Sequence, residues 1–256
     1  MGMGAIVLLL LALAIQWHYA SGSAPGMIGY DMGLYLDATR GWLAGEPFYP
    51  AWQVAGPYAI GQGAILYPPS SIPLFAAFTI LPAPLFWIIP LGVIALVVAY
   101  HRPAPWTWPI MAAGLAFPPT EVRLTLGNPA MWAAAAVALG TVYGWPAVLA
   151  LVKPSLAPFA LVGANRRSWW LALAGLAVGS AVFGTLWLDY LTVLANSQNP
   201  QGLLYSLHDV PLMLIPLVAW LGSRLPDQPP IMWLAMLRRN GLAPHMLRRG
   251  RPSGCR

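Results

Sequence analysis

The sequence predicts an all-α, polytopic transmembrane helical bundle with roughly seven to nine membrane segments, several of them short or interrupted by proline. Only 8% of the 256 residues are charged and 59% are hydrophobic, whereas charged residues make up about a quarter of an ordinary soluble domain. The mean hydropathy is +0.65. Apolar segments near the length that crosses about 30 Å of hydrocarbon recur along the chain. We therefore expect a multi-pass protein of the cell membrane.

The N-terminal part is predicted to contain a membrane anchor followed by an external loop. The apolar segment 5–17 has no preceding Lys or Arg, so it lacks the basic region of a secretory signal peptide and is interpreted as an anchor. The loop, about 18–71, is rich in Gly, Pro and Tyr. Its apolar residues at helical spacing are Leu34, Tyr35, Ala38 and Trp42. They predict a short helix, ending at Gly45, that lies in the membrane interface with its apolar side toward lipid.

Proline-broken apolar segments make up most of the remaining chain. In 67–100, prolines at positions 82, 84 and 90 are expected to interrupt the helix. The stretch then forms either two short crossings with a turn at 81–84 or one long kinked helix. Further apolar segments lie at 106–117, 130–142, 146–152, 156–162, 170–190 and 210–221. Because broken helices at membrane depth must lie inside protein or beside a water-filled cavity, we expect the chain to enclose one.

The charge distribution predicts a topology for the late part of the chain. Of the thirteen basic residues, seven lie from Arg224 onward. Residues 225–256 are therefore interpreted as a basic cytoplasmic tail held near anionic lipid, and 1–224 as the membrane domain. The segment 170–190 is expected to cross outward as one helix, which places 192–210 outside, on the same side as Asp31.

The residue inventory also bears on cofactors and partners. The single cysteine, Cys255, cannot form an internal disulfide or a cysteine metal site. The four histidines are scattered and form no ligand cluster with acids, so a divalent metal is not expected. Glycines are spread along the chain and form no phosphate-binding loop. We expect no nucleotide cofactor and no nucleic acid partner.

Asp31 is the strongest candidate for catalysis. It belongs to a group of three acids within residues 31–46, although the whole chain contains only seven. A carboxylate at a membrane surface can act as a general base that takes a proton from an acceptor hydroxyl. The alternatives are a solvated loop carboxylate and a cap of the following helix.

Four other charged or titratable residues are considered as ligands or ion-pair partners. Lys153 lies between apolar half-helices and suits a phosphate ligand, or else it is a lysine that snorkels to the interface. Arg40 either binds phosphate or pairs with Asp37. Arg123 is expected to form a local ion pair with the nearby Glu121. His208, on the predicted outer side, is a candidate for substrate binding, or else it is an incidental interfacial histidine.

Four short patterns, taken in chain order, carry a family resemblance. An early acid, Asp31, leads into a helix with Tyr35, Ala38, Gly45 and Tyr49. Tyr67, Pro68 and Pro69 open the next membrane segment, and a Gly-Asn pair (127–128) precedes a helix of small residues. Lys153–Pro154 separates two short apolar stretches. In this combination the chain resembles the multi-spanning GT-C glycosyltransferases, in particular the bacterial family 87, which uses polyprenol-phosphate-mannose.

The resemblance implies a hexosyltransferase that moves a sugar, with mannose expected, from a polyprenyl phosphate donor to a lipid or glycan acceptor. The site would face the extracytoplasmic side. Asp31 would be the base, and Lys153 and Arg40 would bind the phosphate. The remaining substrate-binding residues would be Tyr35, Tyr67, Asn128 and His208.

The chain departs from the family in three respects. Asn128 stands where Gln is usual, the N-terminus lacks a basic leader, and the chain is much shorter than family members. These departures keep three alternatives open: a small transporter with a midplane site, a non-catalytic membrane scaffold, and an inactive, truncated member of the family.

Overall fold

The computed structural model describes residues 27–61, 63–198 and 207–223, together with isolated positions between 7 and 22. It is 74% helical with almost no sheet, which confirms the all-α prediction. The predicted anchor (5–17) falls largely outside the described residues, and the basic tail (225–256) falls entirely outside them.

The described chain consists of short helices joined by tight turns. The α-helices are α2 (Tyr30–Leu43), α3 (Ala51–Ala55), α4 (Ile72–Phe78), α5 (Leu85–His101), α6 (Thr107–Leu115), α7 (Pro118–Leu126), α8 (Ala130–Tyr143), α9 (Ala157–Ala160), α10 (Arg167–Ala181), α11 (Leu186–Asn196) and α12 (Val210–Leu221). The 3₁₀ helices are η1 (Pro69–Ser71), η2 (Trp145–Val152), η3 (Pro154–Leu156) and η4 (Leu161–Gly163). A two-residue parallel pair joins β1 (Tyr58–Ala59) to β2 (Ser197–Gln198).

Helix length bears on the predicted membrane segments. Within the described ranges, every helix taken singly is too short or too polar to meet the length and hydropathy required of a membrane span. One pair, α10 and α11, meets the requirement when the two helices are taken together, across a bend of 96°. The segment 170–190, expected to be one helix, is therefore broken. The break lies between Ala181 and Leu186 and contains Gly184, whose φ of 48° favours glycine.

The predicted helix of the external loop is present as α2, but its buried side contacts protein where contact with lipid was expected. Gly29, with φ 74°, precedes the helix, and Gly45, with φ 95°, follows its end. Its buried residues are Tyr35, Leu36 and Thr39, and the helix packs against α4 and α7. This buried side is covered by protein, because aromatic residues of α4 lie against it, and so it is not the lipid-facing surface that the sequence suggested.

In the proline-rich stretch the two-helix alternative is correct. Helix α4 ends at Phe78 and α5 begins at Leu85, with the turn at Leu81–Pro84 between them. Pro90, which was expected to break the stretch, lies inside α5. A proline there removes one backbone hydrogen bond, yet its ring is buried and the helix continues to His101.

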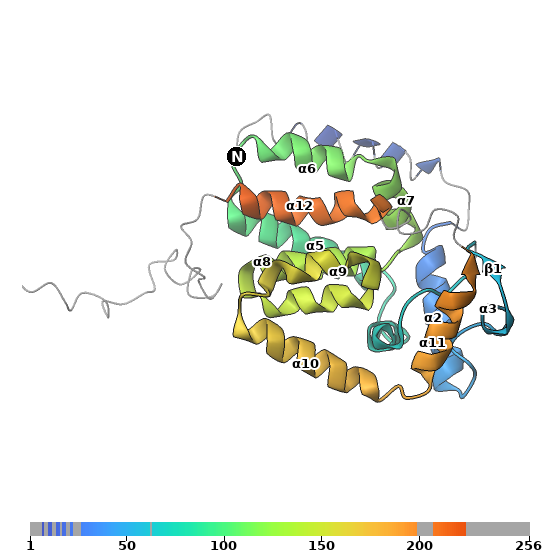
Figure 1. Cartoon of the computed structure of the whole chain (residues 1–256). Coiled ribbons are helices and arrows are strands. Elements are labelled where there is room, and N and C mark those ends of the chain that lie inside the picture. The colour runs from blue at the N-terminus through green and yellow to red at the C-terminus, as the bar shows by residue number, and fades with distance from the viewer. Residues whose placement is uncertain are drawn as a thin grey trace, which may run out of the picture. The chain divides into compact units, whose positions relative to one another are not determined.

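The core is built around α8, which is buried on nearly every side. Its alanines and glycine allow α5, α12 and η2 to pack closely against it, and Figure 1 shows α12 with α6 and α5 beside it. The approach of η2 is the closest: a Cβ added at Gly140 would lie 2.5 Å from the Cβ of Ala147. Small side chains on α8 therefore set the spacing of the surrounding helices.

The loop after α2 is attached to the end of α11. The Gln53 amide pairs with the backbone of Ile65 through both its oxygen and its nitrogen (2.9 and 3.2 Å). The Asn196 amide donates to the carbonyls of Gln53 and Val54. The Tyr58 hydroxyl donates to the carbonyl of Val193. Side-chain amides and a phenol thus supply the hydrogen bonds that this irregular backbone requires.

We predict that Gly140→Ala lowers the free energy of unfolding by about 1–3 kcal/mol, because the added methyl group overpacks the contact with Ala147. The matched control is Gly175→Ala in α10, where an added Cβ meets no atom within 4 Å. That change should stabilise by up to about 1 kcal/mol through helix propensity. Thermal unfolding of the purified proteins measures both effects, and equal melting temperatures for the two variants would contradict the close packing of α8 on η2.

Candidate functional site

Two glycine turns bring the start of α2 to the junction of α7 and α8. The Gly29 N–H donates to the carbonyl of Thr125 at 2.8 Å, and the Trp87 indole N–H donates to the carbonyl of Leu124 at 2.7 Å. Gly127 ends α7 with φ 69°, and a Cβ there would lie 2.8 Å from the ring of Trp87 and 3.0 Å from the Cβ of Met32. Only glycine fits this close approach with a left-handed conformation, and the next residue, Asn128, is thereby placed beside Asp31.

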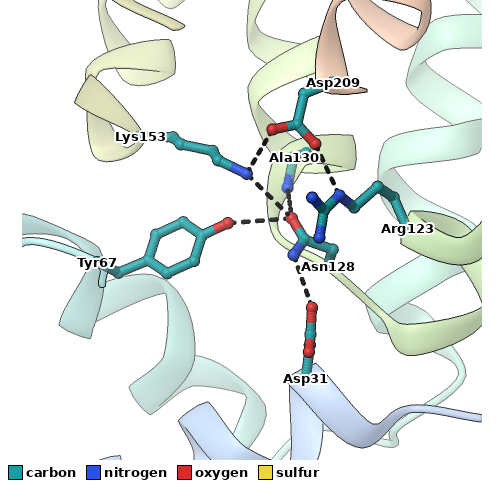
Figure 2. Close-up of polar contacts among 7 residues, drawn as sticks. All are labelled: Asp31, Tyr67, Arg123, Asn128, Ala130, Lys153 and Asp209. Carbon is teal, nitrogen blue, oxygen red and sulfur yellow. Dashed lines mark hydrogen bonds and ion pairs between the residues drawn. The ribbon is translucent and has the colours of Figure 1, made fainter. Parts of the chain in front are cut away.

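The Asn128 amide is the centre of the site (Figure 2). Its Nδ2 donates to Asp31 Oδ2 at 2.6 Å, joining residues 97 positions apart in sequence. Its Oδ1 accepts from the backbone N–H of Ala130 at 3.0 Å and from the Tyr67 hydroxyl at 3.1 Å. Lys153 Nζ lies 3.4 Å from the same oxygen. Since donors surround the oxygen, the amide orientation is fixed and its NH₂ group must face the Asp31 carboxylate.

Lys153 reaches the site from a break between two 3₁₀ helices. The residue is extended (φ −123°, ψ 91°) between η2 and η3, so its side chain leaves the helical path. Its Nζ lies 5.6 Å from the centre of the Tyr67 ring, which is within cation–π range. The side chain is 11% exposed, and the lysine is therefore a nearly buried cation within a polar cluster.

Asp209 holds two cations together behind Asn128. Its Oδ2 lies 2.8 Å from Lys153 Nζ and its Oδ1 lies 3.1 Å from Arg123 Nε. Figure 2 shows the carboxylate between the two basic side chains. The Asp209 side chain is fully buried, and Arg123 is 12% exposed. Charges this deeply buried require an opposite charge nearby.

Aromatic rings hold Tyr67 in position. The ring of Tyr35 meets the Tyr67 ring edge-on at 4.8 Å and stacks on Phe75 at 5.0 Å. The Tyr49 hydroxyl donates to the backbone carbonyl of Tyr67 at 2.8 Å. The phenol that reaches Asn128 therefore has little freedom to rotate, because both its ring and its backbone are fixed by buried contacts.

Burial and charge act in opposite directions on Asp31. The carboxyl is half-buried, and this burial raises its pKa above the usual value for aspartate. The hydrogen bond from Asn128 and the attraction of Arg123 and Lys153 lower the pKa, and the repulsion by Asp209 raises it again. The result is a carboxyl group that accepts a proton more readily than a solvated aspartate.

The structure brings most of the predicted site residues together. Asp31, Tyr67, Asn128 and Lys153 are joined by direct contacts, and Tyr35 packs against Tyr67. Asp31 is the second residue of α2, whose N-cap position, Gly29, precedes it, and so the alternative role as a helix cap is wrong. The alternative of a freely solvated carboxylate is also wrong, because the group is half-buried and hydrogen-bonded.

Two predicted substrate-binding residues do not join this cluster. Arg40 is exposed and pairs with Asp37 at 2.8 Å, one helical turn away. The charge pair lies on the polar side of α2, because positions three apart on a helix are neighbours. His208 is also exposed, on a short turn whose next residue is the fully buried Asp209.

Sequence reasoning missed two members of the cluster, Arg123 and Asp209. The expected ion pair of Arg123 with Glu121 is wrong: the Arg123 guanidinium pairs with Asp209, and the Glu121 carboxylate accepts from Thr125 at 2.8 Å. Residues two apart on a helix point in different directions, whereas Thr125 lies one turn after Glu121. In the sequence, Asp209 stands out as a charged residue at the start of an apolar helix. An aspartate that only caps the helix would give the same pattern, so the sequence does not distinguish the two roles.

An apolar hollow lies where α10 and α11 meet η1 and η2. It has a volume of about 370 Å³ and opens to the surface. Its lining includes Ser70, Leu151, Leu176 and Trp187. Ser70 follows Tyr67 closely in sequence and Leu151 closely precedes Lys153, so two of the segments that line the hollow also supply the polar cluster.

No protein-family model, curated protein or solved structure matches this chain. Among the described residues, no group of three or more His, Cys, Asp and Glu side chains is placed to hold a metal ion. The chemistry of the site therefore rests on the contacts of its own side chains.

We predict that Asp31→Asn is at least as stable as the wild type at pH 7. The folded-state pKa of Asp31 is raised, so protonation of its carboxyl group favours the folded state. This contribution to stability is fully present below the unfolded-state pKa, about 3.9. The contribution is lost as pH rises through the folded-state pKa. The uncharged amide does not have this penalty, and its oxygen can still accept the bond from Asn128.

Chemical denaturation between pH 3 and pH 8 measures this difference, which should shrink toward the acid end. Asp37→Asn is the control, since Asp37 is exposed on the same helix. A large loss of stability in Asp31→Asn at pH 7 would mean that the ionised carboxylate serves the fold.

Proposed function

We propose that this chain is a membrane glycosyltransferase that moves a sugar, with mannose expected, from a polyprenyl phosphate donor to an extracytoplasmic lipid or glycan acceptor. The observation that carries the proposal is the contact network that joins Asp31 through Asn128 to Tyr67 and Lys153. It combines a carboxylate able to accept a proton with cations able to bind phosphate. The resemblance to the GT-C family, drawn from the same residues, supports it.

The reaction assigned to the site is a single displacement at the anomeric carbon. The Asp31 carboxylate takes the proton of the acceptor hydroxyl as its oxygen forms a bond to the anomeric carbon. The bond from that carbon to the phosphate oxygen breaks, and the electron pair leaves with the polyprenyl phosphate. The raised pKa of Asp31 favours proton acceptance in this step, and the hydrogen bond from Asn128 orients the carboxylate.

Lys153 and Arg123 are the groups proposed to bind the departing phosphate. Both are nearly buried, and both pair with the same carboxylate. In a site with little water, their charges stabilise the negative charge that develops on the leaving group more strongly than exposed cations could. Arg123 takes the place that the sequence assigned to Arg40, which is exposed and paired with Asp37.

Apolar surface on this chain supports a lipid-linked substrate and a membrane location. The hollow lined by Leu151, Leu176 and Trp187 is of a kind that receives hydrocarbon, and two of the segments that line it also supply residues of the polar cluster. Large apolar side chains on α10 and α11 are strongly exposed, among them Leu171 (75%), Val178 (74%) and Leu188 (64%). An exposed apolar surface of this kind suits contact with lipid.

A transporter of anions is the second candidate. Lys153 lies at a helix break, as charged binding groups of transporters often do. Helix α10 of the bent pair α10–α11 packs against η2, which ends just before Lys153. A transporter needs the cations but has no use for a base. The effect of removing the Asp31 carboxylate on sugar transfer therefore separates the two functions.

We predict that Asp31→Asn reduces sugar transfer by a factor of about 10²–10⁴, the usual contribution of a general base. The measurement is transfer of radiolabelled sugar from a polyprenyl phosphate to lipid acceptors in membranes containing the expressed protein. Asp37→Asn, which makes the same change on the exposed side of α2, should keep wild-type transfer. An Asp31→Asn protein that transfers at the wild-type rate would exclude Asp31 as the base.

The pH dependence of transfer supplies a second prediction. The base must be ionised, so kcat/KM should fall as pH drops through the pKa of Asp31. Asn128→Ala removes a hydrogen bond that lowers this pKa, and the acid limb should move to higher pH. The control is Asn196→Ala, which removes an asparagine with two hydrogen bonds at the end of α11, and its acid limb should stay at the wild-type pH. An unchanged limb in Asn128→Ala would contradict the role given to the contact with Asp31.

A further inference from the structure

Asp209 has contacts unlike those of an ordinary aspartate at the start of a helix. It occupies the N-cap position of α12, where aspartate usually accepts a hydrogen bond from the backbone of the first turn. Its side chain makes no such capping bond. Each carboxylate oxygen instead faces a different cation, Arg123 and Lys153. The carboxylate thus leaves its usual local partner and places its charge between two basic groups.

Two oxygens of one anion that bridge two cations are also the arrangement expected for a bound phosphate. A phosphate presents several oxygens, and Lys and Arg are its usual ligands. Without an anion between them, Lys153 and Arg123 would be two nearly buried like charges, 11% and 12% exposed. Such a pair is costly, so the protein needs an internal counter-charge whenever a phosphate is missing.

We propose that Asp209 is an internal substitute for the substrate phosphate: it holds Lys153 and Arg123 when no phosphate is bound and competes with a phosphate group for them. The identity of the ligand, a phosphate ester, rests on the proposed function. The new element is that Asp209 controls the affinity of the site for that ligand. Competition by Asp209 weakens phosphate binding, which limits retention of the phosphate product after sugar transfer.

The arrangement of exposure agrees with this competition. Asp209 is fully buried, whereas both cations and Asp31 keep some exposure. A phosphate that enters from the exposed side therefore reaches the cations first and Asp209 last. The negative charge behind the cations opposes the incoming anion, and removal of that charge should increase its affinity.

The test uses Asp209→Ala, which removes the carboxylate and leaves space between the two cations. We predict that inorganic phosphate binds this variant at least about tenfold more tightly than the wild type, since one opposing charge is lost at close range. The readout is the rise in melting temperature of the full-length protein with phosphate concentration, which reports binding through linkage. Chloride at equal ionic strength is the control anion.

Three matched variants define the site. Asp37→Ala removes an exposed carboxylate next to a cation and should bind phosphate as the wild type does. Asp209→Glu keeps the charge and should keep the weak affinity. Lys153→Met combined with Asp209→Ala removes one of the two cations and should lose the gain. An Asp209→Ala protein with wild-type or weaker affinity for phosphate would overturn the proposal.

If Asp209→Ala does not accumulate as folded protein, the comparison of the wild type with Lys153→Met takes its place. Phosphate should then raise the melting temperature of the wild type at high concentration and should not raise that of Lys153→Met. An equal response, or no response of the wild type, would overturn the proposal.

A second arm repeats the titrations with polyprenyl phosphate in nanodiscs and distinguishes a lipid headgroup from free phosphate. A larger gain with the lipid identifies the headgroup as the ligand, and a gain with inorganic phosphate alone identifies free phosphate. These binding measurements need no sugar transfer. A chain that transfers sugar but shows no gain on loss of Asp209 therefore refutes only the competition, and the reverse result refutes only the transferase.

Discussion

The need to balance charge inside an apolar protein governs the centre of this structure. Between residues 27 and 223 the sequence contains six basic and six acidic side chains. Four of these twelve, Asp31, Arg123, Lys153 and Asp209, gather at one place. Two positive and two negative charges there can balance one another. Because the cost of burying an unpaired charge exceeds that of most single packing defects, the elements that carry these residues must meet.

The meeting of these elements depends on tight turns more than on long helices. Asp31 lies two residues after the left-handed Gly29, Asn128 directly follows the left-handed Gly127, and Lys153 lies in an extended break between 3₁₀ helices. Each polar side chain thus leaves the chain where the backbone changes direction. At such places a side chain can point into a cluster without interrupting the packing of a neighbouring helix. The small residues of α8 complete the arrangement, since they allow the surrounding elements to approach.

Asn128 connects the two halves of the cluster. Its amide contacts a carboxylate on one side and a phenol and a cation on the other. An amide suits this position because it offers a donor and an acceptor at the same time and carries no charge. For the proposed transferase it links the base to the phosphate-binding cations, so the two ends of the reaction are held at a fixed separation by one side chain.

The sequence by itself determined the all-α class, the positions of most helices and two charged members of the cluster, whereas Tyr67 and Asn128 were expected only from the family resemblance. Local signals are sufficient for these: apolar segments and prolines mark α5, α8 and α12, and an ionisable residue in an apolar chain stands out without knowledge of its partner. Asp31 and Lys153 were found in this way.

Only the tertiary structure decided the partners. The ion pairs of Asp209 join residues from three separate parts of the chain, and long-range pairs of this kind leave no periodic pattern in the sequence. Arg123 had a charged neighbour two positions away and Arg40 had one three positions away. Helical geometry forms the second pair and excludes the first. The sharp bend between α10 and α11 was likewise invisible, because an uninterrupted apolar segment predicts one helix, and the direction of the chain after Gly184 depends on the surfaces against which each half packs.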